Sequence, residues 1–166
     1  FRDLLDEFFD SKYIHIIRDP RAVVASRIKA KWSRNTPWPI HALVYSMQEY
    51  LFAATYKKVS ENMKSRILII SYEELIANSN IVLDKLCKFL NLAPMSLSFE
   101  SPQFIECASR TFSSKEASWK SNVLKKPQVY FIDKWIQVLS SLQIFLVEAF
   151  CACHMVRNQY TLKSIL

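Results

Sequence analysis

The stretch YIHIIRDPRAVVASR, residues 13–27, decides the fold of this chain. Its first five residues, 13–17, are β-branched or aromatic apart from one histidine, which predicts a short strand buried on both faces, as in a parallel sheet. Pro20 suits the first turn of a helix and Asp19 suits its N-cap, so a helix is expected over 22–31. A strand that leads at once into a helix is the start of an α/β unit.

The same order of elements returns later in the chain. Residues 66–70 predict a second buried strand, and Ser71 and Glu74 have the spacing of a capping box. Helical patterns cover 40–63, between the strands, and 80–92, after them. Parallel strands joined by crossover helices predict a three-layer α/β fold, with a parallel sheet flanked by helices. Further helices are predicted over 1–9 and 135–156, whereas 94–129 reads as less regular. The pattern over 40–63 rests on apolar residues at helical spacing: Ile40, Leu43, Val44, Met47, Leu51 and Ala54.

The composition excludes several classes of protein. The 166 residues include no glycine, so a glycine-rich phosphate loop, a dinucleotide-binding turn and a nucleophile elbow are all excluded from these residues. Hydrophobic residues make up 51% of the chain, which favours a globular core over disorder. The net charge of +7 favours an anionic partner, which could be nucleic acid, an anionic membrane, a phosphorylated cofactor or an acidic glycan.

The four cysteines are too few for a disulfide scaffold. Cys151, Cys153 and His154 together resemble half of a metal site. A zinc site needs about four ligands, and no second cluster of such residues faces these three. The sequence therefore predicts no metal.

The end of the first predicted strand has the features of an anion site. Arg18 offers a planar fork of donors, and the helix that opens after Pro20 is expected to present free N–H groups and a partial positive charge. Ser26 adds a hydroxyl two turns further on, while Asp19 would cap the helix rather than bind the anion. Residues 71–74 leave the same edge of the sheet, where ligands of such folds bind. The alternative is a set of ordinary surface arginines around a helix start.

Residues 13–27 resemble the 3′-phosphate-binding block of sulfotransferases. In that family, an arginine at the strand end and a serine eight positions later hold the 3′-phosphate of 3′-phosphoadenosine 5′-phosphosulfate, a spacing that Arg18 and Ser26 match. The resemblance also implies a contact from Arg27. The form RDPRAV-x-x-SR is most similar to the Golgi carbohydrate sulfotransferases, which sulfate the 6-hydroxyl of galactose, N-acetylglucosamine or N-acetylgalactosamine.

Two further blocks resemble the same family. Residues 67–92 match its strand, Tyr-Glu-Glu-Leu turn and helix, which implies that Tyr72 lies near the adenine. The C-terminal residues follow the spacing of the glycan enzymes' last block, and a Trp-basic pair makes Lys120 a further cofactor candidate. Asn91 and Gln159 stand where the family favours glycine.

The resemblance implies a P-loop NTPase-like sulfotransferase fold that is incomplete at its N-terminus. The family's glycine-containing 5′-phosphosulfate loop lies upstream, so residues 1–166 are expected to form the C-terminal part of a single sulfotransferase domain. The implied reaction transfers a sulfuryl group from 3′-phosphoadenosine 5′-phosphosulfate to a carbohydrate hydroxyl without a metal. The implied location is the Golgi lumen, with a glycan or glycoconjugate as acceptor and with membrane attachment through a segment upstream of this chain.

The catalytic base stays unassigned, because His15 is expected to be a packed core residue and His41 a solvated one. Two other functions are open. An inactive sulfotransferase-like module would bind the nucleotide without transferring sulfate, which the replacements at Asn91 and Gln159 favour. A basic nucleic-acid-binding domain would want clustered Lys and Arg with aromatic platforms, or a reading helix, and neither is present in the sequence.

Overall fold

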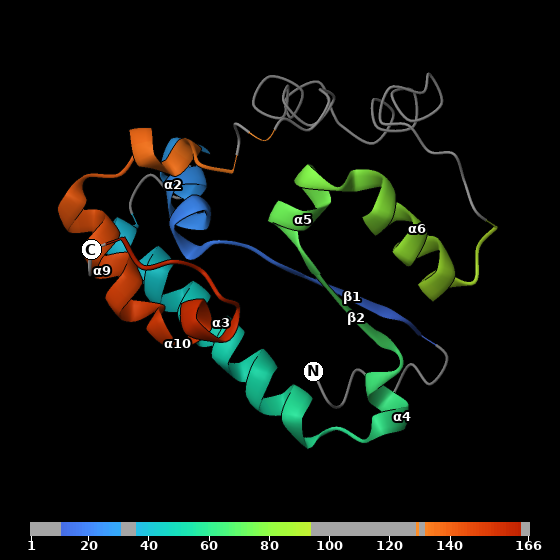
Figure 1. Ribbon diagram of the computed structural model, residues 1–166. Coiled ribbons are helices and arrows are strands. Elements are labelled where there is room, and N and C mark those ends of the chain that lie inside the picture. The colour runs from blue at the N-terminus through green and yellow to red at the C-terminus, as the bar shows by residue number, and fades with distance from the viewer. Residues whose placement is uncertain (1–10, 31–35, 94–128, 130–131, 164–166) are drawn as a thin grey trace. The chain divides into compact units, whose positions relative to one another are not determined.

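A computed structural model shows the protein as two compact units (Figure 1). Unit 1 comprises Phe1–Ile69 and Asp133–Leu166, and unit 2 comprises Ile70–Ile132. The prediction that the chain is part of one domain stays a prediction. The residues that the structure describes are 11–30, 36–93, 129 and 132–163. The predicted helix over 1–9, Lys31 at the end of the next predicted helix, and nearly all of 94–129 lie outside them.

The two predicted strands are present and pair with each other. Strand β1 (Tyr13–Ile17) and strand β2 (Ile67–Ser71) are neighbours in a two-stranded sheet and run in the same direction (Figure 1). The backbone N–H of Tyr13 donates to the carbonyl of Arg66 at 2.8 Å, so the start of one strand lies against the start of the other. Helix α2 (Pro20–Ala30) follows β1 directly, as predicted. The parallel arrangement confirms the α/β prediction.

The two faces of β1 differ in burial. Ile14 and Ile16 are 43% and 53% exposed, whereas His15 is half-buried and stacks on Phe52 with ring centroids 3.6 Å apart. The prediction that β1 is buried on both faces is therefore wrong. Only the face that carries His15 packs against helix α3 (Trp38–Lys58), which explains the alternation along the strand.

The helical pattern predicted over 40–63 forms two helices. Helix α3 ends where Val59 adopts an extended backbone, with φ −78° and ψ 150°. Ser60 then caps the short helix α4 (Glu61–Lys64) by accepting a hydrogen bond from the backbone N–H of Met63. The break reflects the preference of serine for the N-cap position, where its hydroxyl replaces a missing helical acceptor.

Helix α3 buries a different face from the one its apolar spacing suggests. Its buried residues are Ala42, Tyr45 and Glu49, while Met47 and Leu51 are 58% and 54% exposed. Ala42 allows close approach of the neighbouring helices, and Tyr45 and Glu49 find polar partners in the interior. These contacts between distant segments override the hydrophobic period.

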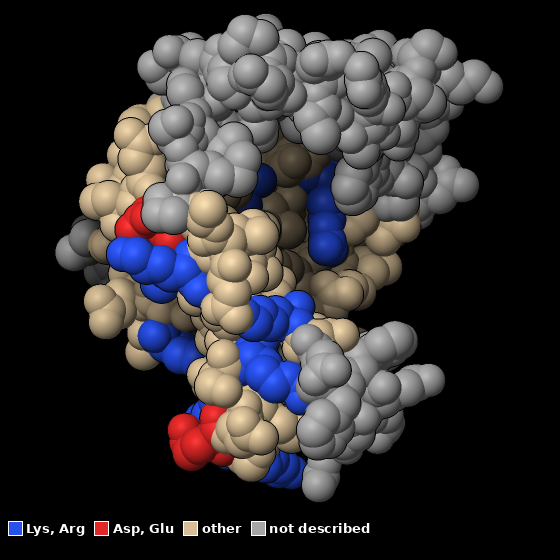
Figure 2. All heavy atoms as spheres, turned by 90° about the vertical axis from the view of Figure 1, so that its right-hand side faces the viewer, with Lys and Arg blue, Asp and Glu red and all other residues tan. Residues whose placement is uncertain are grey.

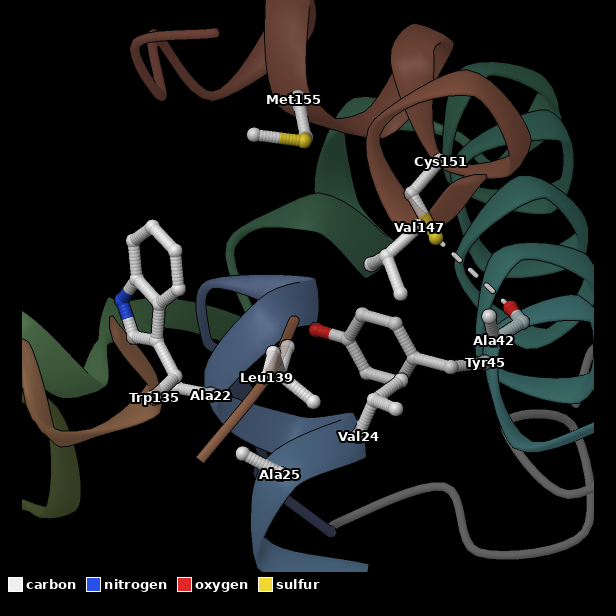
Figure 3. Close-up of a cluster of buried hydrophobic side chains, with 10 residues drawn as sticks. All are labelled: Ala22, Val24, Ala25, Ala42, Tyr45, Trp135, Leu139, Val147, Cys151 and Met155. Carbon is white, nitrogen blue, oxygen red and sulfur yellow. Dashed lines mark hydrogen bonds between the residues drawn. The ribbon is translucent and has the colours of Figure 1, made fainter. Parts of the chain in front are cut away.

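The core of unit 1 lies among four helices and a 3₁₀ turn (Figure 3). Helices α2 and α3 meet the C-terminal helices α9 (Ser141–Phe150) and α10 (Ala152–Arg157) around it. The helix predicted over 135–156 is therefore interrupted, first by a capping box of Ser140 and Gln143 and then at Cys151. Its N-terminal part is the 3₁₀ turn Lys134–Gln137. The buried residues of this core are Ala22, Val24, Ala25, Ala42, Tyr45, Trp135, Leu139, Val147, Cys151 and Met155.

Unit 2 contains two described helices. The hydroxyl of Ser71 caps helix α5 (Tyr72–Ala77) by accepting from the N–H of Glu74, as the spacing of those residues predicts. Helix α6 (Ser79–Leu90) follows and buries Val82, which confirms the helix predicted over 80–92.

Two residues adopt the left-handed backbone conformation that normally favours glycine. Asn91 ends α6 with φ 58°, and Gln159 follows α10 with φ 60°. In each turn, the next residue closes a six-residue hydrogen-bonded loop, from Leu92 N–H to the Cys87 carbonyl and from Tyr160 N–H to the Met155 carbonyl, both at 2.9 Å. These are the positions where the sulfotransferase resemblance expects glycine. No helix within the described residues is long and apolar enough to span a membrane.

Candidate functional site

Three of the predicted site residues lie in the turn after β1 and in helix α2. Arg18 directly follows β1 and is half-buried, Ser26 is exposed on α2, and Arg27 beside it is half-buried. Asp19 is the N-cap of α2, because its Oδ1 accepts from the backbone N–H of Arg21 at 2.8 Å. The prediction that Asp19 caps the helix is thus confirmed.

The start of α2 offers fewer backbone donors than the sequence suggests. Pro20 has no N–H, the N–H of Arg21 is used by Asp19, and the N–H of Val23 donates to the Asp19 carbonyl at 3.1 Å. The expectation of a helix start with free N–H groups is therefore wrong in part. An anion at this turn would rely on the side chains of Arg18 and Ser26, assisted by the positive end of the helix dipole.

A buried tyrosine holds the backbone of Arg18. The hydroxyl of Tyr45 donates to the Arg18 carbonyl at 2.8 Å and accepts from the Arg18 N–H at 3.4 Å. The Tyr45 ring extends from α3 toward α2 through the core (Figure 3). Sequence reasoning missed this residue, because nothing in a helical pattern shows which tyrosine will reach a turn 27 residues away.

Arg21 lies at the centre of a buried ionic network. Its Nη2 and Nε donate to the carboxylate of Asp19 at 2.7 and 3.0 Å, and its Nη1 donates to Glu148 Oε1 at 2.6 Å and to the Thr161 carbonyl at 3.0 Å. The guanidinium also lies 4.1 Å from the centroid of the Trp135 ring. Burial lowers the pKa of Arg21, but the hydrogen bonds and charges of Asp19 and Glu148 outweigh it and raise the pKa. Arg21 therefore supports the turn from inside the protein.

A second buried cluster connects β1, α3 and α10. The Oε2 of Glu49 lies 3.3 Å from Nε2 of His15 and 3.4 Å from Nδ1 of His154. Burial raises the pKa of Glu49, but hydrogen bonds from the two histidines and their charges lower it to about 2. His15 is a packed residue, as predicted, with its ring against Phe52.

The remaining predicted residues have different surroundings. The Nη1 of Arg27 donates to the His41 carbonyl at 3.4 Å, so part of its guanidinium is used within the protein. Burial, followed by the charge of Arg27, lowers the pKa of His41. Tyr72 is the first residue of α5, belongs to unit 2 and is half-buried. Lys120 lies outside the described residues. The predicted roles of Tyr72 near the adenine and of Lys120 as a cofactor contact both stay predictions.

The Cys-x-Cys-His sequence does not converge on one point. The Sγ of Cys151 donates to the Ala42 carbonyl at 3.7 Å and is buried, which raises its pKa to about 12, whereas Cys153 is exposed and His154 pairs with Glu49. Among the residues that the structure describes, no group of three or more His, Cys, Asp or Glu could hold a metal ion. On the face drawn in Figure 2, Lys and Arg are more prominent than Asp and Glu, in line with the net charge of +7.

Solved structures of known proteins have a fold similar to that of this chain. The sulfotransferase domain from the curacin biosynthetic pathway is 20% identical over 92% of this chain, with a TM-score of 0.65. The sulfotransferase domain from the olefin synthase of Synechococcus PCC 7002 is 22% identical over 90% of this chain, with a TM-score of 0.58. The chain spans about half of each domain, 54% in both cases. No curated protein matches the chain.

The two solved domains share the fold of this chain. A family model described as the sulfotransferase family matches residues 1–96, which contain the β1–α2 turn, β2 and the two described helices of unit 2. This match covers more than half of the 166 residues. The chain belongs to the sulfotransferase family.

Proposed function

We propose that the protein takes part in the transfer of a sulfuryl group from 3′-phosphoadenosine 5′-phosphosulfate to a hydroxyl group, with this chain holding the 3′-phosphate. The observation that carries the proposal is the β1–α2 turn, where Arg18 and Ser26 stand on one strand–helix unit of a sulfotransferase-family chain. The bound nucleotide would supply the activated sulfuryl group: the acceptor oxygen bonds to sulfur, the bond from sulfur to the 5′-phosphate oxygen breaks so that adenosine 3′,5′-bisphosphate leaves, and the hydroxyl proton passes to the unassigned base.

The residues at this turn fit a phosphate group. The guanidinium of Arg18 can donate two parallel hydrogen bonds to phosphate oxygens, and the exposed hydroxyl of Ser26 can donate one more. Tyr45 fixes the backbone of Arg18 from the core, so the arginine starts from a defined position. Positioning and charge stabilisation of this kind are the protein's main contribution to transfer reactions that resemble phosphoryl transfer.

We propose a carbohydrate hydroxyl as the acceptor, with the Golgi lumen as the place of the reaction. The support for this is the resemblance of residues 18–27 to the block of the Golgi carbohydrate enzymes, together with a net charge of +7 that suits acidic glycans. The two solved domains come from the curacin biosynthetic pathway and from an olefin synthase, and neither name refers to a carbohydrate. An acceptor screen with labelled sulfate compares sugars with other alcohols. Transfer exclusively to alcohols that are not sugars would overturn this choice of acceptor.

The 3′-phosphate site is tested by nucleotide binding to the full chain. Calorimetry with adenosine 3′,5′-bisphosphate and with adenosine 5′-phosphate measures the preference for the 3′-phosphate. Charge-assisted hydrogen bonds contribute about 1.5–3 kcal/mol each, so Arg18→Ala should remove most of that preference. Arg66→Ala is the matched control, because Arg66 is a half-buried arginine at the opposite end of the strands. Equal preference in Arg18→Ala and the parent protein would refute the site.

Nucleotide binding without transfer is the second candidate function. The observation that favours it is the pair of left-handed residues, Asn91 and Gln159, which occupy positions where the family favours glycine. Both residues lie in turns that end helices, so their replacement bears on stability more directly than on the anion site. Transfer of labelled sulfate to any acceptor would exclude this candidate. Bisphosphate binding without transfer would favour it only in a protein that also carries the 5′-phosphosulfate loop, which residues 1–166 cannot supply without glycine.

A further inference from the structure

We infer that Glu148 is a positioning residue for the 3′-phosphate site and acts through Arg21 on the β1–α2 turn. The inference rests on the function proposed above. Glu148, the Thr161 carbonyl and the Lys163 N–H come from α9 and the segment after α10, and together they form what we term the C-terminal clasp. The residues that the clasp holds lie more than 120 positions earlier in the chain.

The guanidinium of Arg21 connects the clasp to the turn. On one side, Nε and Nη2 bind both carboxylate oxygens of Asp19, the residue that caps α2. On the other side, Nη1 donates to Glu148 and to the carbonyl of Thr161. Arg21 is 4% exposed, Asp19 is 5% exposed and Glu148 is 2% exposed, so these charged groups are shielded from water and depend on one another.

Glu148 is itself held in place by the segment that follows α10. Its Oε1 accepts from the backbone N–H of Lys163 at 2.9 Å as well as from Arg21. Two cations lie near the ring of Trp135, since Arg21 Cζ is 4.1 Å and Lys163 Nζ is 5.1 Å from its centroid. These contacts restrict the Arg21 side chain to one orientation and keep residues 161–163 against it.

The orientation of Arg21 affects the charge next to Arg18. With Arg21 engaged, the carboxylate of Asp19 is neutralised and directed to the first turn of α2. If Arg21 lost Glu148, its guanidinium could turn, the cap would loosen and the carboxylate of Asp19 would be left beside an incoming phosphate. The negative charge of the Asp19 carboxylate would repel the phosphate and weaken its binding. A displaced start of α2 would also weaken the attraction between the helix dipole and the anion.

The test is Glu148→Gln in the full chain, with the preference for adenosine 3′,5′-bisphosphate over adenosine 5′-phosphate as the readout. We expect that preference to fall about fivefold, the scale of a helix-terminus effect, while affinity for adenosine 5′-phosphate stays near that of the parent protein. Glu49→Gln is the matched control, because it removes another buried carboxylate, one that is bound to histidines rather than to Arg21. It should lower stability without changing the preference.

Lys163→Pro is a milder second variant for the case in which Glu148→Gln does not fold. At an exposed position, it removes the backbone N–H that donates to Glu148 and also the ammonium group near Trp135, and it should lower the preference about twofold. If both variants keep the parent preference while Arg18→Ala loses it, the positioning role is refuted and the 3′-phosphate site stands. If Arg18→Ala also keeps the preference, the proposed function fails instead. An equal loss in Glu49→Gln would refute a specific role for Glu148.

Discussion

Replacing Gln159 by glycine should make the protein more stable. Gln159 has φ 60°, is exposed, and lies in the turn that closes α10 through the bond from Tyr160 N–H to the Met155 carbonyl. In this conformation, the Cβ of any residue other than glycine crowds the following carbonyl. The substitution removes that Cβ while it leaves the backbone bonds of the turn in place.

The expected gain follows from two opposing contributions. A left-handed residue with a Cβ costs about 1–2 kcal/mol relative to glycine. Glycine in turn makes the unfolded chain more flexible, which costs about 0.4–1 kcal/mol. The free energy of unfolding of Gln159→Gly should therefore rise by about 1 kcal/mol. Asn91→Gly, at φ 58°, should gain less, because asparagine tolerates this conformation better than glutamine does.

The assay is urea unfolding of the full chain, followed by circular dichroism, with the thermal midpoint as a second measure. A gain of about 1 kcal/mol corresponds to a rise of about 2–4 °C for a domain of this size. Gln159→Ala is the control, because alanine keeps the Cβ and should bring no gain. A midpoint of Gln159→Gly at or below that of the parent protein, or an equal rise in Gln159→Ala, would refute the reasoning.

Three further predictions concern buried groups. Tyr45→Phe should lower the free energy of unfolding by about 1–2 kcal/mol and reduce the 3′-phosphate preference, because the Arg18 backbone loses its hydrogen-bond partner. An unchanged preference in nucleotide-binding calorimetry would contradict this. The pKa of Glu49 is about 2 in the folded protein and about 4.3 in the unfolded chain. Its carboxylate therefore contributes about 3 kcal/mol to the free energy of unfolding. This contribution is present above about pH 4.3 and is lost as the pH falls toward 2. Urea unfolding of Glu49→Gln between those pH values should show a flatter acid dependence, and a slope equal to that of the parent protein would count against the cluster. Iodoacetamide at neutral pH should label exposed Cys153 well before buried Cys151, whose pKa is about 12, and equal rates by mass spectrometry would disprove that difference.

The local parts of the fold could be predicted from the sequence. The strand at 13–17, the cap at Asp19 and the cap at Ser71 all depend on residues within a few positions of one another, and the structure has each of them. The special backbone at Asn91 and Gln159 was indicated by the family's glycines at those positions. Patterns of this kind involve residues within one turn or one strand, so they can be recognised in a single sequence without knowledge of contacts between distant segments.

The parts that join distant segments could not be predicted. The apolar stripe of α3 is largely exposed, because Ala42, Tyr45 and Glu49 turn toward partners on β1, α2 and the C-terminal helices. The pair between Arg21 and Glu148 spans 127 positions, and nothing near either residue indicates the other. Arg18 and Ser26 were found from the features of an anion site and from the family block, whereas the residues that hold the turn in place became visible in the structure.

The pair between Arg21 and Glu148 also has a consequence for synthesis on the ribosome. At about 5–20 residues per second, the 127 positions that separate Arg21 from Glu148 correspond to a wait of about 6–25 seconds. During that time Arg21 can pair with Asp19, but Glu148, which completes their ionic network, has not yet been made. Unit 1 is made of the first and the last part of the chain, so it closes after unit 2 has been translated. The β1–α2 turn is therefore made well before Glu148, the residue that completes its ionic network.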